Sequence, residues 1–227
     1  MRDLFDRVAG RYDMANKVLS VGSDTRWRRV VAQEVLRGNP RTVLDMCSGT
    51  ADQVLAIRAS KDFNGRVLGA DISREMLLLG IEKLQRHGYA APMVLSDAHD
   101  LGMRSGVFDC VTLCFGVRNF DRIVEGLKEM RRVLRPQGKI VILEFTRPAN
   151  RFLWALYRQY LTRVLPWVGG VVTGQRAAYR YLASSIDSFL TPAQLAARVE
   201  EAGFTQVRHT FLSAGIVAIT TAIKKEI

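Results

Sequence analysis

The sequence lacks any hydrophobic run long enough to cross a membrane. Its most apolar stretches, residues 139–145 and 214–223, are much shorter than the roughly 18–20 residues that a membrane-spanning helix needs. The first ten residues, MRDLFDRVAG, carry two aspartates and no apolar segment, so they do not resemble a signal peptide. We therefore expect a cytoplasmic protein without a membrane span.

Cysteine and histidine are also scarce. Cys47, Cys110 and Cys114 are odd in number and lack the spacing of a disulfide framework, which favours a reducing compartment. The three histidines are scattered and do not combine with the cysteines at the spacing of a zinc site. We therefore expect neither disulfides nor a bound metal.

Positive charge is abundant instead. The 227 residues, enough for one large domain, include 33 Lys and Arg against 22 Asp and Glu, a net charge of +11. Such a chain could bind nucleic acid, an anionic membrane or an acidic ligand. Residues 41–110, however, hold 8 basic and 9 acidic residues, whereas residues 111–190 hold 13 and 5. This uneven distribution argues against a nucleic-acid partner and favours peripheral contact with the inner, anionic face of the cell membrane.

Short apolar, β-branched runs alternate with helical patterns through the middle of the chain. The predicted strands are 42–46, 66–71, 92–97, 108–116 and 139–145, and the predicted helices between them are 51–60, 73–86 and 121–135. This alternation predicts an α/β fold with a doubly wound, mostly parallel sheet. Two helices are expected before it, at 4–20 and 24–36, and Asp24 and Ser73 are the expected N-caps of the second and of helix 73–86.

The alternation stops after Pro148. Helices are predicted at 152–165, 176–189 and 192–202, and two further β runs, 205–212 and 215–223, bring the sheet to seven strands. We interpret the chain as a single domain, 1–227, with N-terminal helices in 1–40. Residues 148–190 are interpreted as a helical insertion that forms a lid over the carboxyl ends of the strands.

Acidic residues follow three successive predicted strands. The first strand ends in Asp45 and leads into a loop of small residues that includes Gly49 and a helix N-terminus. The second strand ends in Asp71, which is placed to accept hydrogen bonds from ribose hydroxyls, and the third ends in Asp97. The alternative to a ligand site in the loop after Asp45 is an ordinary strand–helix turn with an acidic cap.

The loop differs from a dinucleotide-binding fingerprint, because it has one glycine instead of three. Asp45 and Asp52 would repel a pyrophosphate, whereas they would attract a cation such as the sulfonium and ammonium groups of S-adenosylmethionine. We therefore favour S-adenosylmethionine as the cofactor.

Several longer motifs resemble those of one enzyme family. They are FDRVAGRYD (5–13), LDMCSGTAD (44–52), FDCVTLCFGVRNF (108–120), RVLRPQGKIVILEF (132–145) and YRYLASSI (179–186). In these motifs, and over nearly its full length, the sequence resembles the ubiquinone/menaquinone biosynthesis C-methyltransferases, a class I S-adenosylmethionine-dependent family. It departs from the usual pattern at Ser48 and Ala51, where the family often has glycine, and at Gln137.

The resemblance implies a Rossmann-like methyltransferase that transfers a methyl group to a ring carbon of a prenylated quinol, a naphthoquinol or a benzoquinol. It also implies the cofactor contacts Thr50, Asp71, Asp97, Ala98 and Cys114, to which we add Asp45, for the methionine ammonium, and Gly49. The residues Arg118 and Asn119 are expected to stabilise the phenolate, with Arg118 acting electrostatically because arginine is not a base at neutral pH. Tyr12 and Asp13 are expected to close over the site, and Tyr179 and Tyr181 to line a channel for the prenyl tail.

Aromatic residues and arginines are interleaved in the predicted helix 152–165. This pattern suits a membrane interface, although a core-facing helix with a solvated basic side would look the same. An RNA methyltransferase and a non-catalytic binding protein are the alternative functions, and a homo-oligomer is left open.

Overall fold

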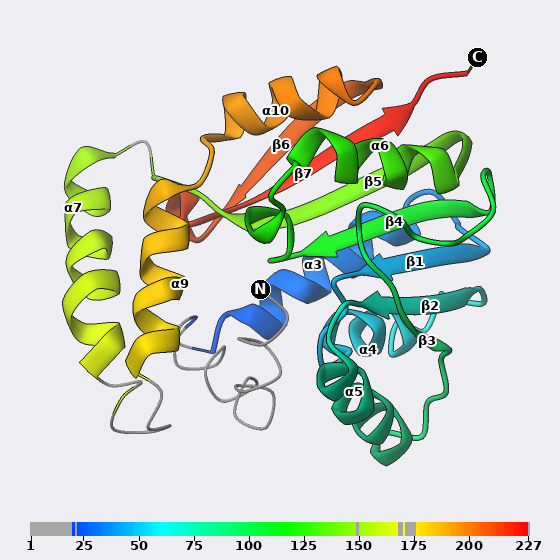
Figure 1. Ribbon diagram of the computed structural model, residues 1–227, viewed down its shortest axis with the longest axis horizontal. Helices are drawn as coiled ribbons and strands as arrows, with labels where there is room; N and C mark the ends of the chain where they lie inside the picture. The colour runs from blue at the N-terminus through cyan, green and yellow to red at the C-terminus, as the bar shows by residue number, and fades with distance from the viewer. Residues whose placement is uncertain (1–19, 21, 149, 168–169, 171–175, 227) are drawn as a thin grey trace.

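The computed structural model describes residues 20, 22–148, 150–167, 170 and 176–226. Its centre is a seven-stranded sheet in the order β3-β2-β1-β4-β5-β7-β6 (Figure 1). The strands are β1 (Thr42–Met46), β2 (Arg66–Asp71), β3 (Met93–Leu95), β4 (Phe108–Cys114), β5 (Leu134–Phe145), β6 (Phe204–Leu212) and β7 (Val217–Lys224). Strands β1 to β5 pair in parallel, and β7 is antiparallel to both β5 and β6. The predicted fold class is confirmed.

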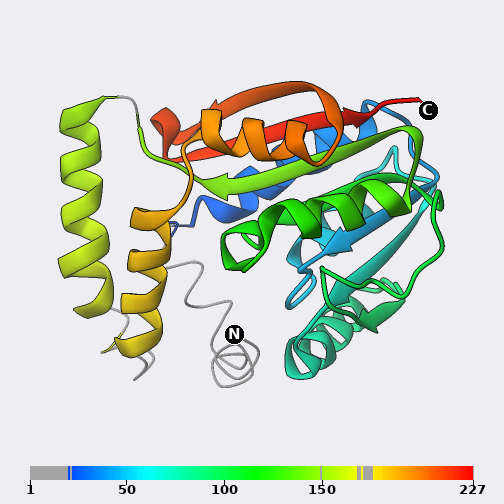
Figure 2. The same cartoon turned by 45° about the horizontal axis from the view of Figure 1, so that its top comes forward.

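Helices cover both faces of the sheet, because its central strands are almost continuously apolar and buried. One hydrophobic cluster joins the sheet to α3 (Asp24–Leu36), α4 (Asp52–Arg58) and α5 (Arg74–Arg86). A second cluster joins it to α6 (Ile123–Val133) and α10 (Pro192–Glu201). Figures 1 and 2 show these two groups of helices on opposite sides of the sheet.

Helix caps explain where several helices begin. The Oγ of Ser73 accepts a hydrogen bond from the backbone N–H of Met76, as predicted for the start of α5. A capping box between Thr191 and Gln194 starts α10. The prediction for Asp24 is wrong by one position, because it is the first residue of α3 and Ser23 occupies the cap.

Two strands differ in length from their predictions. Strand β3 is only three residues long. Strand β5 begins at Leu134, which pairs with Phe108, before the predicted start at residue 139, so the strand includes residues 136–138. These residues form an irregularity within the strand, where the register shifts and Gln137 has a φ of 61°.

The insertion consists of two neighbouring helices beyond the carboxyl ends of β4 and β5 (Figures 1 and 2). Helix α7 (Arg151–Gln159) continues into a π-helical turn, Tyr160–Val164, and α9 is Arg176–Ser188. Their inner sides join the same hydrophobic cluster as α3. None of the helices in the described part of the chain is both long and apolar enough to span a membrane.

Candidate active site

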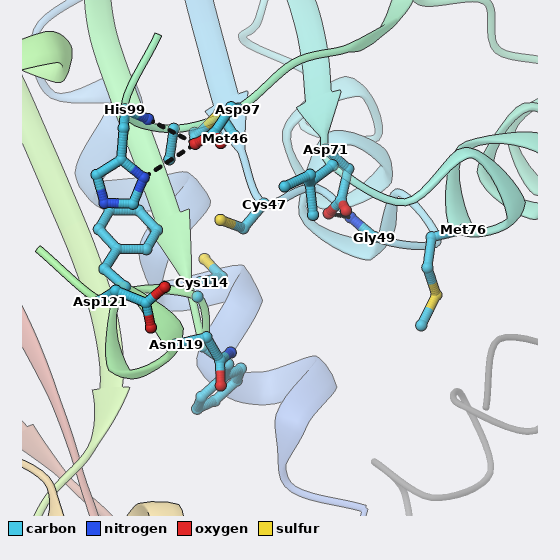
Figure 3. Close-up of a pocket in the computed structure, with 15 residues that line it drawn as sticks. Met46, Cys47, Gly49, Asp71, Met76, Asp97, His99, Cys114, Asn119 and Asp121 are labelled. Atoms are coloured by element: carbon cyan, nitrogen blue, oxygen red, sulfur yellow. Dashed lines mark hydrogen bonds and ion pairs between the residues drawn. The ribbon is translucent and has the colours of Figure 1, made fainter. Parts of the chain in front are cut away.

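A pocket lies at the carboxyl ends of β1, β2 and β4, where ligands bind in open parallel sheets (Figure 3). Its lining comes from the segments that follow these strands and β3. The lining residues are Met46, Cys47, Gly49, Asp71, Ile72, Met76, Asp97, Ala98, His99, Cys114, Phe115, Gly116, Asn119, Phe120 and Asp121. The predicted residues Gly49, Asp71, Asp97, Ala98, Cys114 and Asn119 are therefore brought together at one pocket.

The loop after β1 owes its tight shape to backbone conformation. Cys47, Gly49 and Ala51 all have positive φ values, of 57°, 51° and 64°. Gly116, after β4, lies against this loop so closely that an added Cβ would be 2.6 Å from the Cβ of Cys47. The pocket wall between the two loops therefore depends on glycine at position 116.

Asp71 connects the second strand to the loop of the first. One carboxylate oxygen accepts a hydrogen bond from the Gly49 N–H at 2.8 Å, and the other accepts one from the Ser73 N–H at 2.9 Å. Two backbone amides therefore fix the position of this carboxylate at the end of β2. This arrangement suits a ligand with two neighbouring hydroxyl groups.

Asp97 is held by the residue two positions later. Its Oδ1 accepts hydrogen bonds from the backbone N–H of His99 at 2.8 Å and lies 2.9 Å from the ring Nδ1 (Figure 3). The hydrogen bond from the His99 backbone is the main reason that the pKa of Asp97 is lowered. The His99 ring in turn packs against Phe120 at 5.4 Å between ring centroids.

The pocket is acidic. Three carboxylates line it, those of Asp71, Asp97 and Asp121, and no lysine or arginine is among its described lining residues. Such a lining is unfavourable for a phosphate and favourable for a cationic ligand. Ile72, Met76 and Phe120 add apolar walls against which a ring could pack.

Two predicted contacts, Asp45 and Thr50, lie behind this lining rather than in it. The Oδ1 of Asp45 accepts a hydrogen bond from Thr112 at 2.6 Å, and its buried Oδ2 has no hydrogen-bond partner in the described part of the chain. Burial raises the pKa of Asp45 to about 7. A buried acid of this kind would gain from an ammonium group, which favours its charged form.

Thr50 and Asp52 are both engaged by one lysine. The Nζ of Lys83 donates to the Thr50 hydroxyl at 3.1 Å and lies 2.7 Å from the Asp52 carboxylate. The sequence predicts that Asp52 attracts a cation, but the ion pair with Lys83 neutralises the charge of Asp52. The acidic character of the pocket comes instead from Asp71, Asp97 and Asp121.

The two pocket cysteines are poor nucleophiles. Burial raises the pKa of the Cys47 thiol well above its usual value, and it also raises the pKa of Cys114. Cys114 lies within weak hydrogen-bonding distance of Gln53, with 3.5 Å between Sγ and Oε1. Among the described residues, no group of three or more His, Cys, Asp and Glu side chains is arranged to hold a metal ion.

Arg118 lies beside the pocket in a buried ion pair. Its Nη1 donates to Glu144 Oε1 at 2.7 Å and to the Phe115 carbonyl at 2.6 Å, and the guanidinium lies over the rings of Phe115 and Phe145. Glu144, on β5, was not predicted as a site residue. Its signal in the sequence is that it is the only acid in the apolar run KIVILEF.

Asn119 connects the pocket to the helical insertion. Its Oδ1 accepts a hydrogen bond from the Tyr181 hydroxyl of α9 at 3.1 Å, and Tyr179 is buried on the same helix. The structure therefore brings Tyr181 next to Asn119, and a channel for the prenyl tail lined by Tyr179 and Tyr181 stays a prediction. Tyr12 and Asp13 lie outside the described residues, as does the predicted helix 4–20 apart from its last residue.

Comparisons with known proteins agree on one family. The sequence profile of the ubiE/COQ5 methyltransferase family matches residues 1–224. A demethylmenaquinone methyltransferase of Thermus thermophilus is 39% identical over 216 residues, which are 95% of this chain and 97% of the relative. A ubiquinone/menaquinone biosynthesis C-methyltransferase UbiE of Geotalea uraniireducens is 36% identical over 96% of this chain and 94% of the relative.

Solved structures agree on the fold. A SAM-dependent methyltransferase from Thermotoga maritima superposes with a TM-score of 0.66 at 17% identity, over 99% of this chain and all of the other. A SAM-dependent methyltransferase from Aquifex aeolicus gives a TM-score of 0.61 at 16% identity, over 85% of this chain and 88% of the other. At these identities, the likeness bears on the fold alone.

Proposed function

The chain belongs to the ubiE/COQ5 methyltransferase family, and on this basis we propose that it transfers a methyl group from S-adenosylmethionine to a ring carbon of a prenylated quinol. The relatives are named for demethylmenaquinone and for ubiquinone/menaquinone biosynthesis, so the acceptor is a naphthoquinol, a benzoquinol or both. The observation that carries the proposal is the acidic pocket beside the β1 loop, which Asp71 lines and beside which Arg118 lies.

The residues present fit S-adenosylmethionine. Asp71 would hold the ribose hydroxyls, and Asp97 and Ala98 would lie at the adenine. Asp45, with its unpartnered buried oxygen, would hold the methionine ammonium. When bound, this cofactor supplies an electrophilic methyl group on a sulfonium.

Methyl transfer to a ring carbon requires that the quinol hydroxyl give up its proton to water as the C–C bond forms, and the hydrogen of that carbon then leaves as a proton. Arg118 stabilises the negative charge that develops on the oxygen, while Glu144 fixes the guanidinium in place. Asn119, held by Tyr181, orients the acceptor ring at the pocket edge. Thus Asp71 acts on cofactor binding and Arg118 acts on turnover.

The experiment that tests the function is label transfer from methyl-labelled S-adenosylmethionine. We expect label in a prenylated 1,4-naphthoquinol or a prenylated benzoquinol and none in RNA. Labelled RNA without labelled quinol would contradict the proposal. Mass spectrometry of quinones from cells that lack the protein should show a demethyl species, which would also identify the acceptor.

A peripheral contact with an anionic membrane is a further part of the proposal, because a prenylated quinol resides in lipid. The outer side of α7 and the turns after it expose four large apolar residues, Phe152, Leu156, Val164 and Trp167. Arg151 and Arg163 are exposed beside them. Apolar side chains flanked by arginines match an anionic lipid surface in both hydrophobicity and charge.

The insertion, residues 148–190, acts as a lid in this proposal, within a single domain of 1–227. Its inner side packs on the core, and Tyr181 reaches the pocket residue Asn119. A lid with one face on the site and the other on lipid lets the ring reach the pocket while the tail stays in the membrane.

A further inference from the structure

Tyr157 is buried on the inner side of α7, although the opposite side of this helix is open to solvent. Only 8% of Tyr157 is exposed, against 81% of Phe152 and 61% of Leu156. Its ring neighbours those of Trp154 and Tyr160, with centroid distances of 6.2 Å and 6.3 Å. It belongs to the same hydrophobic cluster as Phe115 and Phe145, the aromatic residues on either side of Arg118.

The Tyr157 hydroxyl is shielded from solvent and has no hydrogen-bond partner among the residues that the structure describes. Burial raises its pKa, so the hydroxyl remains a protonated donor. A buried polar group without a partner is costly, and in native proteins such groups are normally completed by a bound molecule or an ordered water. We therefore expect a hydrogen-bond acceptor beside the Tyr157 hydroxyl.

Arg118 presents a second donor in the same region. The Tyr157 phenol and the guanidinium are close enough to interact electrostatically. Nη1 of Arg118 is used by Glu144 and the Phe115 carbonyl, whereas the buried Nε has no partner in the described part of the chain. Two buried donors in one region that both lack an acceptor are suited to an oxygen atom of a bound molecule.

We infer that Tyr157 is a further substrate-binding residue, whose hydroxyl donates to a ring oxygen of the quinol beside Nε–H of Arg118. This inference rests on the proposed function and adds a contact from α7 to it. The α-helix changes to a π-helical turn at Tyr160, three residues after Tyr157, and such turns are frequent at functional sites. Tyr157 would thus link the position of the lid to recognition of the ring.

The test is Tyr157→Phe, which removes only the oxygen atom. The probe is a 1,4-naphthoquinol or benzoquinol with a short prenyl tail, whichever the wild type methylates. We expect its KM to rise about tenfold, the effect of losing one hydrogen bond to a group that gains charge. The Kd of S-adenosylmethionine should stay unchanged, and Tm should stay equal or rise because an unpartnered hydroxyl has been removed. The matched control is Tyr89→Phe, since Tyr89 is half-buried beside Arg58 on another side of the molecule.

An active Tyr157→Phe variant with an unchanged KM would overturn the inference alone. A lowered Tm together with an unchanged KM would also overturn it, because the hydroxyl would then have its partner within the protein. A wild type that methylates no prenylated quinol would overturn the proposed function and the inference with it.

Discussion

Three aspartates around the pocket have the same side chain and very different surroundings. Asp71 accepts backbone hydrogen bonds, Asp97 is exposed and held by His99, and Asp45 is buried with an unpartnered oxygen. In the proposed function, these surroundings suit the three aspartates to different tasks. A carboxylate whose position is fixed by amides is suited to orient hydroxyls, and a buried acid is suited to bind a cation.

Asp71→Ala is expected to weaken S-adenosylmethionine binding at least 100-fold. Two hydrogen bonds to a carboxylate would be lost, at roughly 1.5–3 kcal/mol each, and the loop amide of Gly49 would lose its acceptor. Isothermal titration calorimetry measures the change. Asp62→Ala removes the same charge from an exposed site and should bind normally. Equal loss in Asp71→Ala and Arg118→Ala would contradict the separation of cofactor binding from turnover.

The raised pKa of Asp45 predicts a pH dependence in two measurements. The folded protein holds this proton up to pH about 7 and the unfolded chain releases it near 3.8, so this group lowers the stability of the unliganded protein as pH rises from 4 to 7. Binding of a cation should release the proton, so affinity for S-adenosylmethionine should rise over the same range. Thermal melts and calorimetry from pH 5 to 8 check both trends, and Asp45→Asn should abolish them.

Glu144→Gln is expected to lower kcat at least tenfold while the Kd of S-adenosylmethionine stays unchanged. The variant leaves the Arg118 guanidinium buried without its anion, which costs about 3–5 kcal/mol and corresponds to a Tm lower by roughly 10 °C. Glu201→Gln is the control, because Glu201 pairs with Arg198 at the surface, where ion pairs contribute little. Unchanged turnover in Glu144→Gln would show that Arg118 needs no partner to act.

The sequence predicted some of these site residues because their signal is local. Asp71 directly follows an apolar strand, and such an acid implies a partner. Glu144 could not be assigned a role in this way, since its partner is 26 residues away in the chain. Asp45 and Thr50 lie behind the pocket wall, because neighbouring residues of a strand or loop point in different directions and a motif does not reveal which one faces the ligand.

Helix α7 has two apolar sides, which is unusual for a helix at the surface. Its inner side, with Tyr157, packs on the core, and its outer side exposes Phe152 and Leu156. The aromatic pattern of this segment suited both a core-facing helix and a membrane interface. The buried inner side shows that α7 faces the core. The exposed apolar side is the reason for proposing a membrane interface as well.

The double variant Phe152→Ser, Trp167→Ser is expected to reduce binding to lipid vesicles by at least tenfold. Trp167 is 64% exposed, and each large apolar side chain contributes about 1.5–3 kcal/mol when it is fully buried. Co-sedimentation with vesicles of mixed anionic and neutral lipid measures the effect. Leu78→Ser is the control, since Leu78 is an exposed apolar residue on α5. Equal vesicle binding by the wild type, the double variant and Leu78→Ser would contradict a role for the exposed apolar residues of α7 and the turns after it.

Across the chain as a whole, charge and fold divide the molecule into two parts. Residues 41–110, with 8 basic and 9 acidic residues, are nearly neutral and supply much of the pocket lining, whereas residues 111–190, with 13 basic and 5 acidic residues, include the insertion. The alternation of strands and helices made the parallel part of the sheet predictable. The position of β7 between β5 and β6 was not, since strand order depends on contacts between distant segments.

The charge predicts that vesicle binding depends on salt and on lipid composition. Each basic residue near an anionic surface contributes about 1 kcal/mol at low salt, and screening shortens this attraction to about 3 Å at 1 M ionic strength. We expect binding to anionic vesicles to fall more than tenfold between 0.05 and 0.5 M salt, measured by co-sedimentation. Binding that is insensitive to both salt and anionic lipid would contradict an electrostatic contact.

The strand order also has a consequence for how the chain folds during synthesis. Strand β7 is the last strand to be made, yet it lies between β5 and β6 and pairs with β5 through seven residues, Lys139 to Phe145. Until residues 217–224 leave the ribosome, β5 has an open edge and β6 has no strand to join. The nascent chain therefore exposes an apolar strand edge until residues 217–224 have been made, and a chain cut before residue 217 is expected to aggregate through that edge.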